Sequence, residues 1–240
     1  MNKNVLLILT FCLISLTAKA QSGGNTFGAR SAGMANSSVT LSDEWANFNN
    51  IGALAGVDKQ YAAFGYANRF GVEGWNTIGA SFVSPMSFGG VAGLGVWRFG
   101  DNLYNENRVS LGYSHKLYGV SLGVQANYFA VSIEGLGTKQ MLILEFGGLV
   151  QLSEKLFMGL HIYNFNQAKL SDFEDERVPT TMRAGISYRP VEKLLVNIET
   201  EKNMDYDPSV RVGVSYELFA EKVFVRTGIS TQPFINYYGV

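Results

Sequence analysis

Residues 109–122 read VSLGYSHKLYGVSL, an alternation of large apolar side chains with small or polar ones. The alternation is interrupted at Tyr118 and Gly119 and then restarts. Because successive side chains of a β-strand point to opposite faces, the stretch predicts a tight hairpin with one apolar and one polar face. Repeats of such a two-faced hairpin build membrane-spanning β-barrels.

The same alternation recurs along most of the chain after residue 58. We predict twelve strands, at residues 59–70, 75–84, 88–98, 108–118, 120–131, 140–152, 155–165, 179–189, 193–202, 208–219, 222–230 and 234–240. These lengths suit the ~9–11 residues that a tilted strand needs to cross a bilayer. The predicted fold class is therefore all-β, a transmembrane antiparallel β-barrel. An even strand number allows closure, and because the chain stops at Val240 within an unfinished pattern, we expect 12–14 strands.

The predicted connections between strands alternate in length. Short turns are expected at residues 84–87, 118–119, 153–154, 190–192 and 220–221, and longer polar loops at residues 71–74, 99–107, 132–139, 166–178 and 203–207. Outer-membrane barrels have short periplasmic turns and longer external loops. A secreted β-sandwich is the main alternative, but it gives no reason for this alternation. The pattern therefore favours a barrel whose N-terminus lies on the periplasmic side.

The composition argues against a nucleic-acid partner. The net charge is -1 and only 16% of the residues are charged, whereas nucleic-acid binding needs clustered lysine and arginine. Glycine is abundant, with 27 residues, although ordinary strands contain little of it. We interpret the strand glycines as positions where backbone segments approach closely inside a crowded barrel.

Residues 1–20 have the pattern of a secretory signal peptide. Lys3 supplies the positive start, residues 5–16 form a mostly apolar run, and residues 18–20 read Ala-Lys-Ala, which is a cleavage site. The apolar run is shorter than the ~20 residues of a transmembrane helix, and no later segment is long and apolar enough to be one.

The chain thus divides into a signal peptide at residues 1–20, an N-terminal plug segment at residues 21–58 and a barrel at residues 59–240. The plug segment is rich in small residues and lacks alternation, so we expect irregular structure with one or two helical turns. The only cysteine, Cys12, lies in the signal peptide. The mature chain is therefore expected to have no disulfide, thiolate nucleophile or thiolate metal site.

Residues 28–55 read GARSAGMANSSVTLSDEWANFNNIGALA. This segment resembles the start of the FadL-like outer-membrane proteins, especially the PorV/PorQ branch of Bacteroidetes. That family opens with G-x-R-x-x-G-M-G, continues with an alanine-rich run and an acidic pair, and ends in N-P-A-G-L. The positions that match this plug motif are Gly28, Arg30, Gly33, Met34, Asp43, Glu44 and Asn50. Ala35 stands in place of a family glycine, and the proline of the last element is missing.

The resemblance implies a fourteen-stranded barrel whose N-terminal segment folds into the lumen as a plug. Members of the family carry hydrophobic compounds across the outer membrane or serve type IX secretion, where PorV escorts cargo from the translocon to the attachment machinery. The implied partners are outer-membrane lipid and type IX secretion subunits or cargo, with a hydrophobic ligand as the alternative. The expected location is the outer membrane.

Charged residues in the predicted strands fall on the parity that faces the lumen. They are Arg108, Lys116, Glu145, Arg183, Arg189, Arg211, Glu217 and Arg226. On the lipid face an arginine or lysine would cost ~2–4 kcal/mol at the membrane midplane. Two interpretations stay open, namely a lumen filled by structural ion pairs and a polar pathway for a ligand headgroup. Asp43 and Glu44 would pair with such arginines and pin the plug segment.

The sequence contains no pattern of a catalytic site, a cofactor site or a metal site. His115 and His161 are the only histidines, and His161 has no recognisable partner motif of the kind that a hydrolase base needs. No phosphate-binding glycine loop and no metal-ligand spacing is present. A membrane-embedded enzyme is therefore the third hypothesis, after a secretion component and a transport channel.

Overall fold

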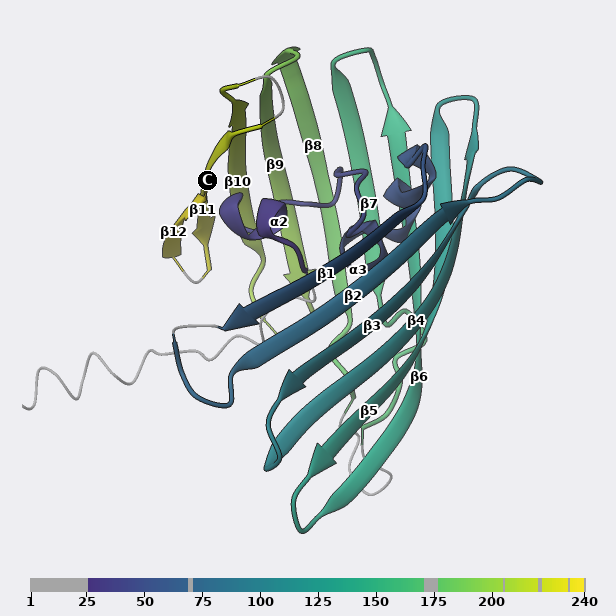
Figure 1. The fold of residues 1–240 in the computed structure, drawn as a ribbon, viewed down its shortest axis with the longest axis vertical. Coiled ribbons are helices and arrows are strands. Elements are labelled where there is room, and N and C mark those ends of the chain that lie inside the picture. Colours follow the sequence, from purple (N-terminus) through teal and green to yellow (C-terminus); the bar gives the residue numbers. More distant parts are fainter. Residues whose placement is uncertain are drawn as a thin grey trace, which may run out of the picture.

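The computed structural model describes residues 26–68, 71–170, 177–204, 206–219, 222–232 and 234–239. In Figure 1 a single, strongly curved sheet surrounds the N-terminal segment of the described chain. The predicted signal peptide, residues 1–20, lies outside the described residues.

The sheet has twelve strands, each antiparallel to the next, in the order β1 to β12. The strands are β1 (Tyr61–Asn68), β2 (Asn76–Pro85), β3 (Val91–Gly100), β4 (Tyr104–Leu117), β5 (Val120–Ile133), β6 (Gly137–Gln151), β7 (Leu156–Tyr163), β8 (Thr181–Val191), β9 (Leu194–Asn203), β10 (Ser209–Glu217), β11 (Phe224–Thr231) and β12 (Phe234–Gly239). The all-β prediction is confirmed. β1 and β12 form the two edges of the sheet, and no pairing joins these edges among the described residues.

The hairpin of β4 and β5 has the predicted register. Leu117 pairs with Val120 across a turn of two residues, Tyr118 and Gly119. These turn residues have φ values of 49° and 87°, as a type I′ turn requires, and this turn type matches the twist of the strands that flank it. Leu111 is 66% exposed on the outer face. A sandwich would bury that side chain under a second sheet.

The outer face of the sheet is apolar along nearly its whole circumference. Its exposed large side chains include Phe64, Ile78, Phe82, Leu94, Val96, Val109, Leu122, Val124, Leu142, Met158, Leu160, Met182, Ile186, Ile198, Val210, Val225 and Ile229. Soluble monomers expose apolar patches of only a few hundred Å². A continuous apolar band on strands of alternating polarity is the pattern of a lipid-facing barrel wall.

The predicted loops at residues 99–107 and 132–139 are wrong. β3 runs to Gly100 and β4 begins at Tyr104, with Phe99 paired to Glu106. The Asp101 carboxylate accepts hydrogen bonds from the backbone of Leu103 and Tyr104 at 2.8 and 3.1 Å and so closes a tight turn. The polar residues at positions 105–107 suggested a loop, but they belong to β4, which extends past the apolar band.

The turn between β5 and β6 is likewise only residues 134–136. The strict alternation of short and long connections is therefore not present in this part of the chain. The long connection between β7 and β8, residues 164–180, does occur, although residues 171–176 within it lie outside the described part of the chain.

The plug segment, of which residues 26–58 are described, carries three short helices. They are α2 (Ala29–Gly33), α3 (Ala46–Asn49) and the 3-10 helix η1 (Ile51–Gly56). Asp43 accepts a hydrogen bond from the backbone of Trp45 at 3.1 Å, just before α3. Among the described residues, none of the helices has the length and apolarity needed to cross a bilayer.

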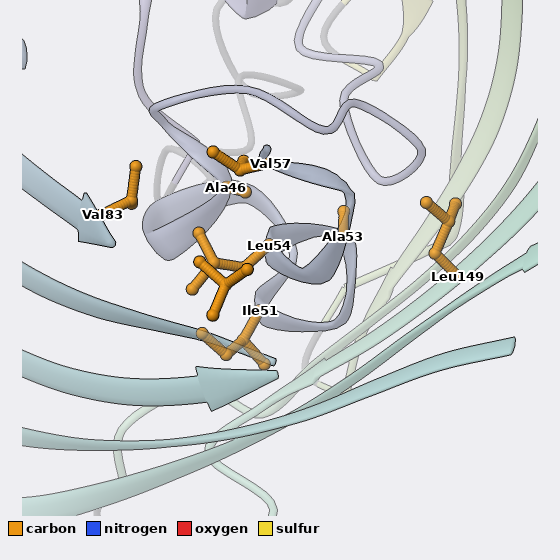
Figure 2. Close-up of a cluster of buried hydrophobic side chains, with 8 residues drawn as sticks. Ala46, Ile51, Ala53, Leu54, Val57, Val83 and Leu149 are labelled. Atoms are coloured by element: carbon orange, nitrogen blue, oxygen red, sulfur yellow. The ribbon is translucent and has the colours of Figure 1, made fainter. Parts of the chain in front are cut away.

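The plug segment also supplies much of the buried apolar core. Figure 2 shows Ile51, Ala53 and Leu54 of η1 gathered with Val83 of β2 and Leu149 of β6. All of these side chains are buried. The main core therefore lies between the plug segment and the inner face of the sheet, and both are needed to form it.

Candidate functional site: the plug segment inside the sheet

A belt of glycines lines the inner face of the sheet where the plug segment crosses it. The belt comprises Gly65, Gly79, Gly93, Gly112, Gly123, Gly147, Gly159, Gly185, Gly213 and Gly228. These glycines face one another across five strand pairs, as Gly65–Gly79, Gly93–Gly112, Gly123–Gly147, Gly159–Gly185 and Gly213–Gly228. Among the described strands, β9 and β12 contribute no glycine to the belt: Glu199 and Asn197 of β9 pair with Gly185 and Gly213, and Tyr237 of β12 pairs with Gly228.

The belt lets the plug backbone lie directly on the strands. A Cβ at Gly123 would lie 2.5 Å from the Ile51 carbonyl oxygen, and one at Gly213 would lie 2.6 Å from the Met34 carbonyl oxygen. Even a single methyl group does not fit between two backbones so close, so the strands need glycine at these positions. This contact accounts for the glycine content of strands that would otherwise avoid it.

Glu199 is the main polar anchor of the plug segment. Its carboxylate accepts hydrogen bonds from the backbone N–H groups of Ser38 and Val39, both at 2.7 Å. The neighbouring Asn197 donates from its side-chain amide to the Ser37 carbonyl at 2.8 Å. Since Glu199 is buried, these charge-assisted bonds are among the strong ones in the protein.

Two arginines neutralise Glu199. Arg183 on β8 and Arg211 on β10 each place a guanidinium nitrogen 3.8 Å from its carboxylate. Arg211 also pairs with Glu201 at 2.7 Å, and Arg183 donates to the Asn49 carbonyl of the plug segment. The four charged groups form a buried network that joins three strands to the plug segment.

Further side chains hold the second half of the plug segment. The Gln125 amide donates to the Asn47 carbonyl at 2.9 Å, and the Ser114 hydroxyl donates to the Gly52 carbonyl at 3.0 Å. Asn50 donates to the Gly148 carbonyl at 3.0 Å. Two backbone carbonyls and one side-chain amide of the plug segment thus find their partners on the sheet, as buried polar groups require.

His161 lies beneath the plug segment in a closed set of hydrogen bonds. Its Nε2 is 2.8 Å from the Glu145 carboxylate, and its Nδ1 is 2.9 Å from the Arg183 guanidinium. An arginine can only donate, so Nδ1 accepts, and the Nε2–H group donates a hydrogen bond to the Glu145 carboxylate. Both ring nitrogens are occupied and neither meets a hydroxyl, so the arrangement is not that of a hydrolase triad. Among the described residues, no group of side chains could hold a metal ion.

Replacement of His161 by leucine should lower the free energy of unfolding by about 3 kcal/mol, because it leaves Glu145 and Arg183 with a missing buried partner. The matched control is His115→Leu, at the half-exposed histidine that contacts Tyr113, and its cost should stay below about 1 kcal/mol. Urea unfolding in lipid vesicles measures both. Equal costs for the two variants would contradict the role given to His161.

Arg108 contacts the aromatic part of the plug segment. Its guanidinium lies 5.0 Å from the ring centre of Phe48 and 5.3 Å from that of Trp97. Phe48 belongs to a buried aromatic cluster with Phe27 and Trp45. The arginine is itself buried, so the cation–π contacts occur away from water and hold Phe48 against the wall.

The structure separates the predicted luminal charges into three groups. Arg108, Glu145, Arg183 and Arg211 are buried beneath or beside the plug segment. Glu217 and Arg226 are half-buried, and Lys116 and Arg189 are exposed at the end of the sheet that carries the 118–119 turn. Sequence reasoning missed Glu199 and Glu201, although both lie on the parity opposite to Val196 and Ile198.

The residues of the plug motif have structural contacts of their own. At Gly28, with φ 106°, a Cβ would lie 2.7 Å from Trp45, and at Gly33 it would lie 3.1 Å from the Arg226 side chain. Met34 is fully buried. Asn50 accepts from the Gly52 backbone at 3.0 Å and donates to the Val39 carbonyl at 2.6 Å, so it ties two parts of the plug segment together.

The acidic pair of the motif has a local role in this structure. Asp43 forms an ion pair with Arg30, at 3.6 Å, within the plug segment, and Glu44 is half-buried beside it. Burial raises the pKa of the Asp43 carboxyl above its usual value, and the Arg30 charge opposes that shift. We expected this pair to bind arginines of the wall, but the carboxylate that anchors the plug backbone is Glu199.

No protein-family model matches the chain, and no curated protein matches it. Among solved structures it is similar to a KdgM porin, with a TM-score of 0.42, 15% identity, and coverage of 72% of this chain and 91% of that one. It is also similar to OpdQ of Pseudomonas aeruginosa, with a TM-score of 0.40, 12% identity and coverage of 75% and 59%. A BenF-like porin from Pseudomonas fluorescens gives a TM-score of 0.37, 9% identity and coverage of 70% and 53%. The chain spans little more than half of the last two.

Proposed function

We propose that this protein is an outer-membrane β-barrel whose own N-terminal segment occupies the lumen, and that it acts without catalysis as a membrane-embedded component of type IX secretion or surface attachment. The observation that carries the proposal is the buried polar network between the plug segment and the wall, centred on Glu199. A water-filled porin keeps a polar open channel, whereas here the inward side chains bind the chain's own backbone.

The resemblance of residues 28–55 to the PorV/PorQ branch is the reason for proposing a role in secretion or surface attachment. A barrel filled by its own segment offers partners a rigid, lipid-embedded body with exposed loops and turns, which suits a docking role. The expected partners are outer-membrane lipid and secretion subunits or cargo. The apolar outer band supports the membrane location, since lipid is the solvent that such a surface needs.

A transport channel for hydrophobic small molecules, as in the FadL-like proteins, is the second candidate. The observation that favours it is the pair of strand edges at β1 and β12, which no described residues join. A lateral opening beside a plug would let an apolar molecule leave the lumen into the membrane. A secretion component should co-purify with secretion subunits, whereas a transport channel should let a hydrophobic small molecule cross the membrane.

The purified wild-type protein should give no steady ion conductance in planar lipid bilayers, because buried side chains and the plug segment fill its lumen. Affinity purification from native outer membranes should recover type IX secretion subunits together with it. A stable open-channel conductance would contradict the closed lumen. Uptake of a hydrophobic probe without co-purifying secretion subunits would favour the transport candidate.

A further inference from the structure

A recess opens where the plug segment meets the end of the sheet that carries the 118–119 turn. Its volume is about 340 Å³. The plug segment contributes Thr40, Ser42 and Gly56, and the wall contributes residues of β4 to β8. The recess is separate from the Glu199 network, since it shares no residue with that network.

The recess is electropositive. Lys116 from β4 and Arg189 from β8 line it, and none of the described residues that line it is acidic. Neither cation forms an ion pair with a carboxylate within the described part of the chain. Concave sites lined by one sign of charge concentrate ions of the opposite sign.

Hydrogen-bonding groups accompany the two cations. Ser42, Ser121 and Gln151 line the recess, and so does Thr40, whose side chain is 5% exposed. The Thr40 hydroxyl oxygen has no hydrogen-bond partner among the described residues. Buried hydroxyls are nearly always satisfied, so this one points to a missing partner. The backbone beside Thr40 is held in place, because the Val39 N–H donates to Glu199.

One wall of the recess is apolar. Leu149 and Phe157 form it, and the Arg189 guanidinium lies 5.6 Å from the Phe157 ring centre. The ring holds the guanidinium by a cation–π contact and leaves its N–H groups able to bind a ligand. The recess thus combines a cationic, hydroxyl-lined part with a short apolar wall.

We propose that this recess binds a phosphate group carried on a small organic ester, held by Lys116, Arg189 and the Thr40 hydroxyl. A phosphate offers several strong acceptor oxygens and up to two negative charges, which match two cations and a row of donors better than a single carboxylate does. The ester carbon chain would lie along Leu149 and Phe157. The source is either a soluble phosphomonoester or the headgroup of a phospholipid. This site goes beyond the proposed secretion role and does not depend on it.

The test is titration calorimetry on the full-length protein in an uncharged detergent at pH 8. The probes are inorganic phosphate, glycerol 3-phosphate and a short-chain phosphatidic acid. Removing either cation, in Lys116→Gln or Arg189→Gln, should weaken binding by about tenfold or more, as expected for loss of a charged hydrogen bond. Lys193→Gln is the matched control, because Lys193 is an exposed lysine in the turn between β8 and β9 at the same end. It should bind like wild type.

Thr40→Val separates a ligand contact from a merely unsatisfied group. If the hydroxyl binds phosphate, this variant weakens binding and keeps its folding. Binding of glycerol 3-phosphate assigns a soluble source, and binding of phosphatidic acid alone assigns a lipid source. Absence of binding by all three probes would overturn the proposal, and so would binding that Lys116→Gln and Arg189→Gln leave unchanged.

Discussion

Gly147→Ala should lower the free energy of unfolding by about 1–3 kcal/mol, the usual cost of forcing an extra group into a packed interior. The added Cβ would meet the Asn50 side chain and would lie 2.6 Å from the Gly52 backbone nitrogen. Both groups belong to the plug segment and are held by hydrogen bonds to the wall or to each other. The plug segment must therefore shift, and several of its contacts shift with it.

The matched control is the next residue, Gly148. Its Cβ would point to the outer side, with the nearest atom, a Leu122 methyl carbon, at an ordinary 3.4 Å. Gly148→Ala should leave the free energy of unfolding unchanged or raise it by up to about 1 kcal/mol, since alanine loses less chain entropy on folding than glycine. Urea unfolding in lipid vesicles measures both variants. Equal destabilisation of the two would mean that the inner face has no special need for glycine.

Glu199→Gln should lower the free energy of unfolding by about 3–5 kcal/mol, the usual cost of breaking a buried charge network from one side. Arg183 and Arg211 would keep their charges inside the protein while losing the carboxylate that balances them. The plug backbone at Ser38 and Val39 would lose a charged acceptor. We expect the plug segment to loosen before the sheet unfolds.

Labelling of a buried thiol separates these two effects. In a Cys12→Ser background, a cysteine in place of the fully buried Ser38 should react slowly with a water-soluble maleimide, and Glu199→Gln should speed the reaction at least about tenfold. Glu201→Gln is the control. Glu201 pairs with Arg211 but forms no hydrogen bond with the described residues of the plug segment. That variant should lose stability without faster labelling, and faster labelling in both would remove the specific role of Glu199.

The alternation of side chains made the wall predictable. At residues 109–122 both faces and the turn follow from spacing alone, because only a strand gives a period of two. The ends of β3 and β4 did not follow, because Asn105, Glu106 and Asn107 have the composition of a loop. Such residues suit the end of a strand that extends beyond the apolar band, where both faces of the sheet contact water.

The contacts of the plug segment could not be read from the sequence. Parity places Glu145 and Arg183 on the inner face, but it does not say which backbone groups they meet. Glu199 binds Ser38 across a separation of 161 residues, and only the three-dimensional arrangement brings them together. The abundance of glycine was visible in the composition, but only the structure shows that the belt glycines face the backbone or the side chains of the plug segment.

A disulfide test examines the position of the plug segment most directly. The side chains of Asn47 in the plug segment and Ser81 in β2 meet at 2.9 Å across the inner face, so cysteines at these two positions should form a disulfide in intact membranes when the Cys12→Ser protein carries both. Asn47→Cys with Phe82→Cys is the control, because Phe82 lies on the opposite parity and is exposed on the outer face, and this pair should stay reduced. If the thiols at positions 47 and 81 stayed free and both reacted with a water-soluble maleimide, the plug segment would not lie inside the sheet.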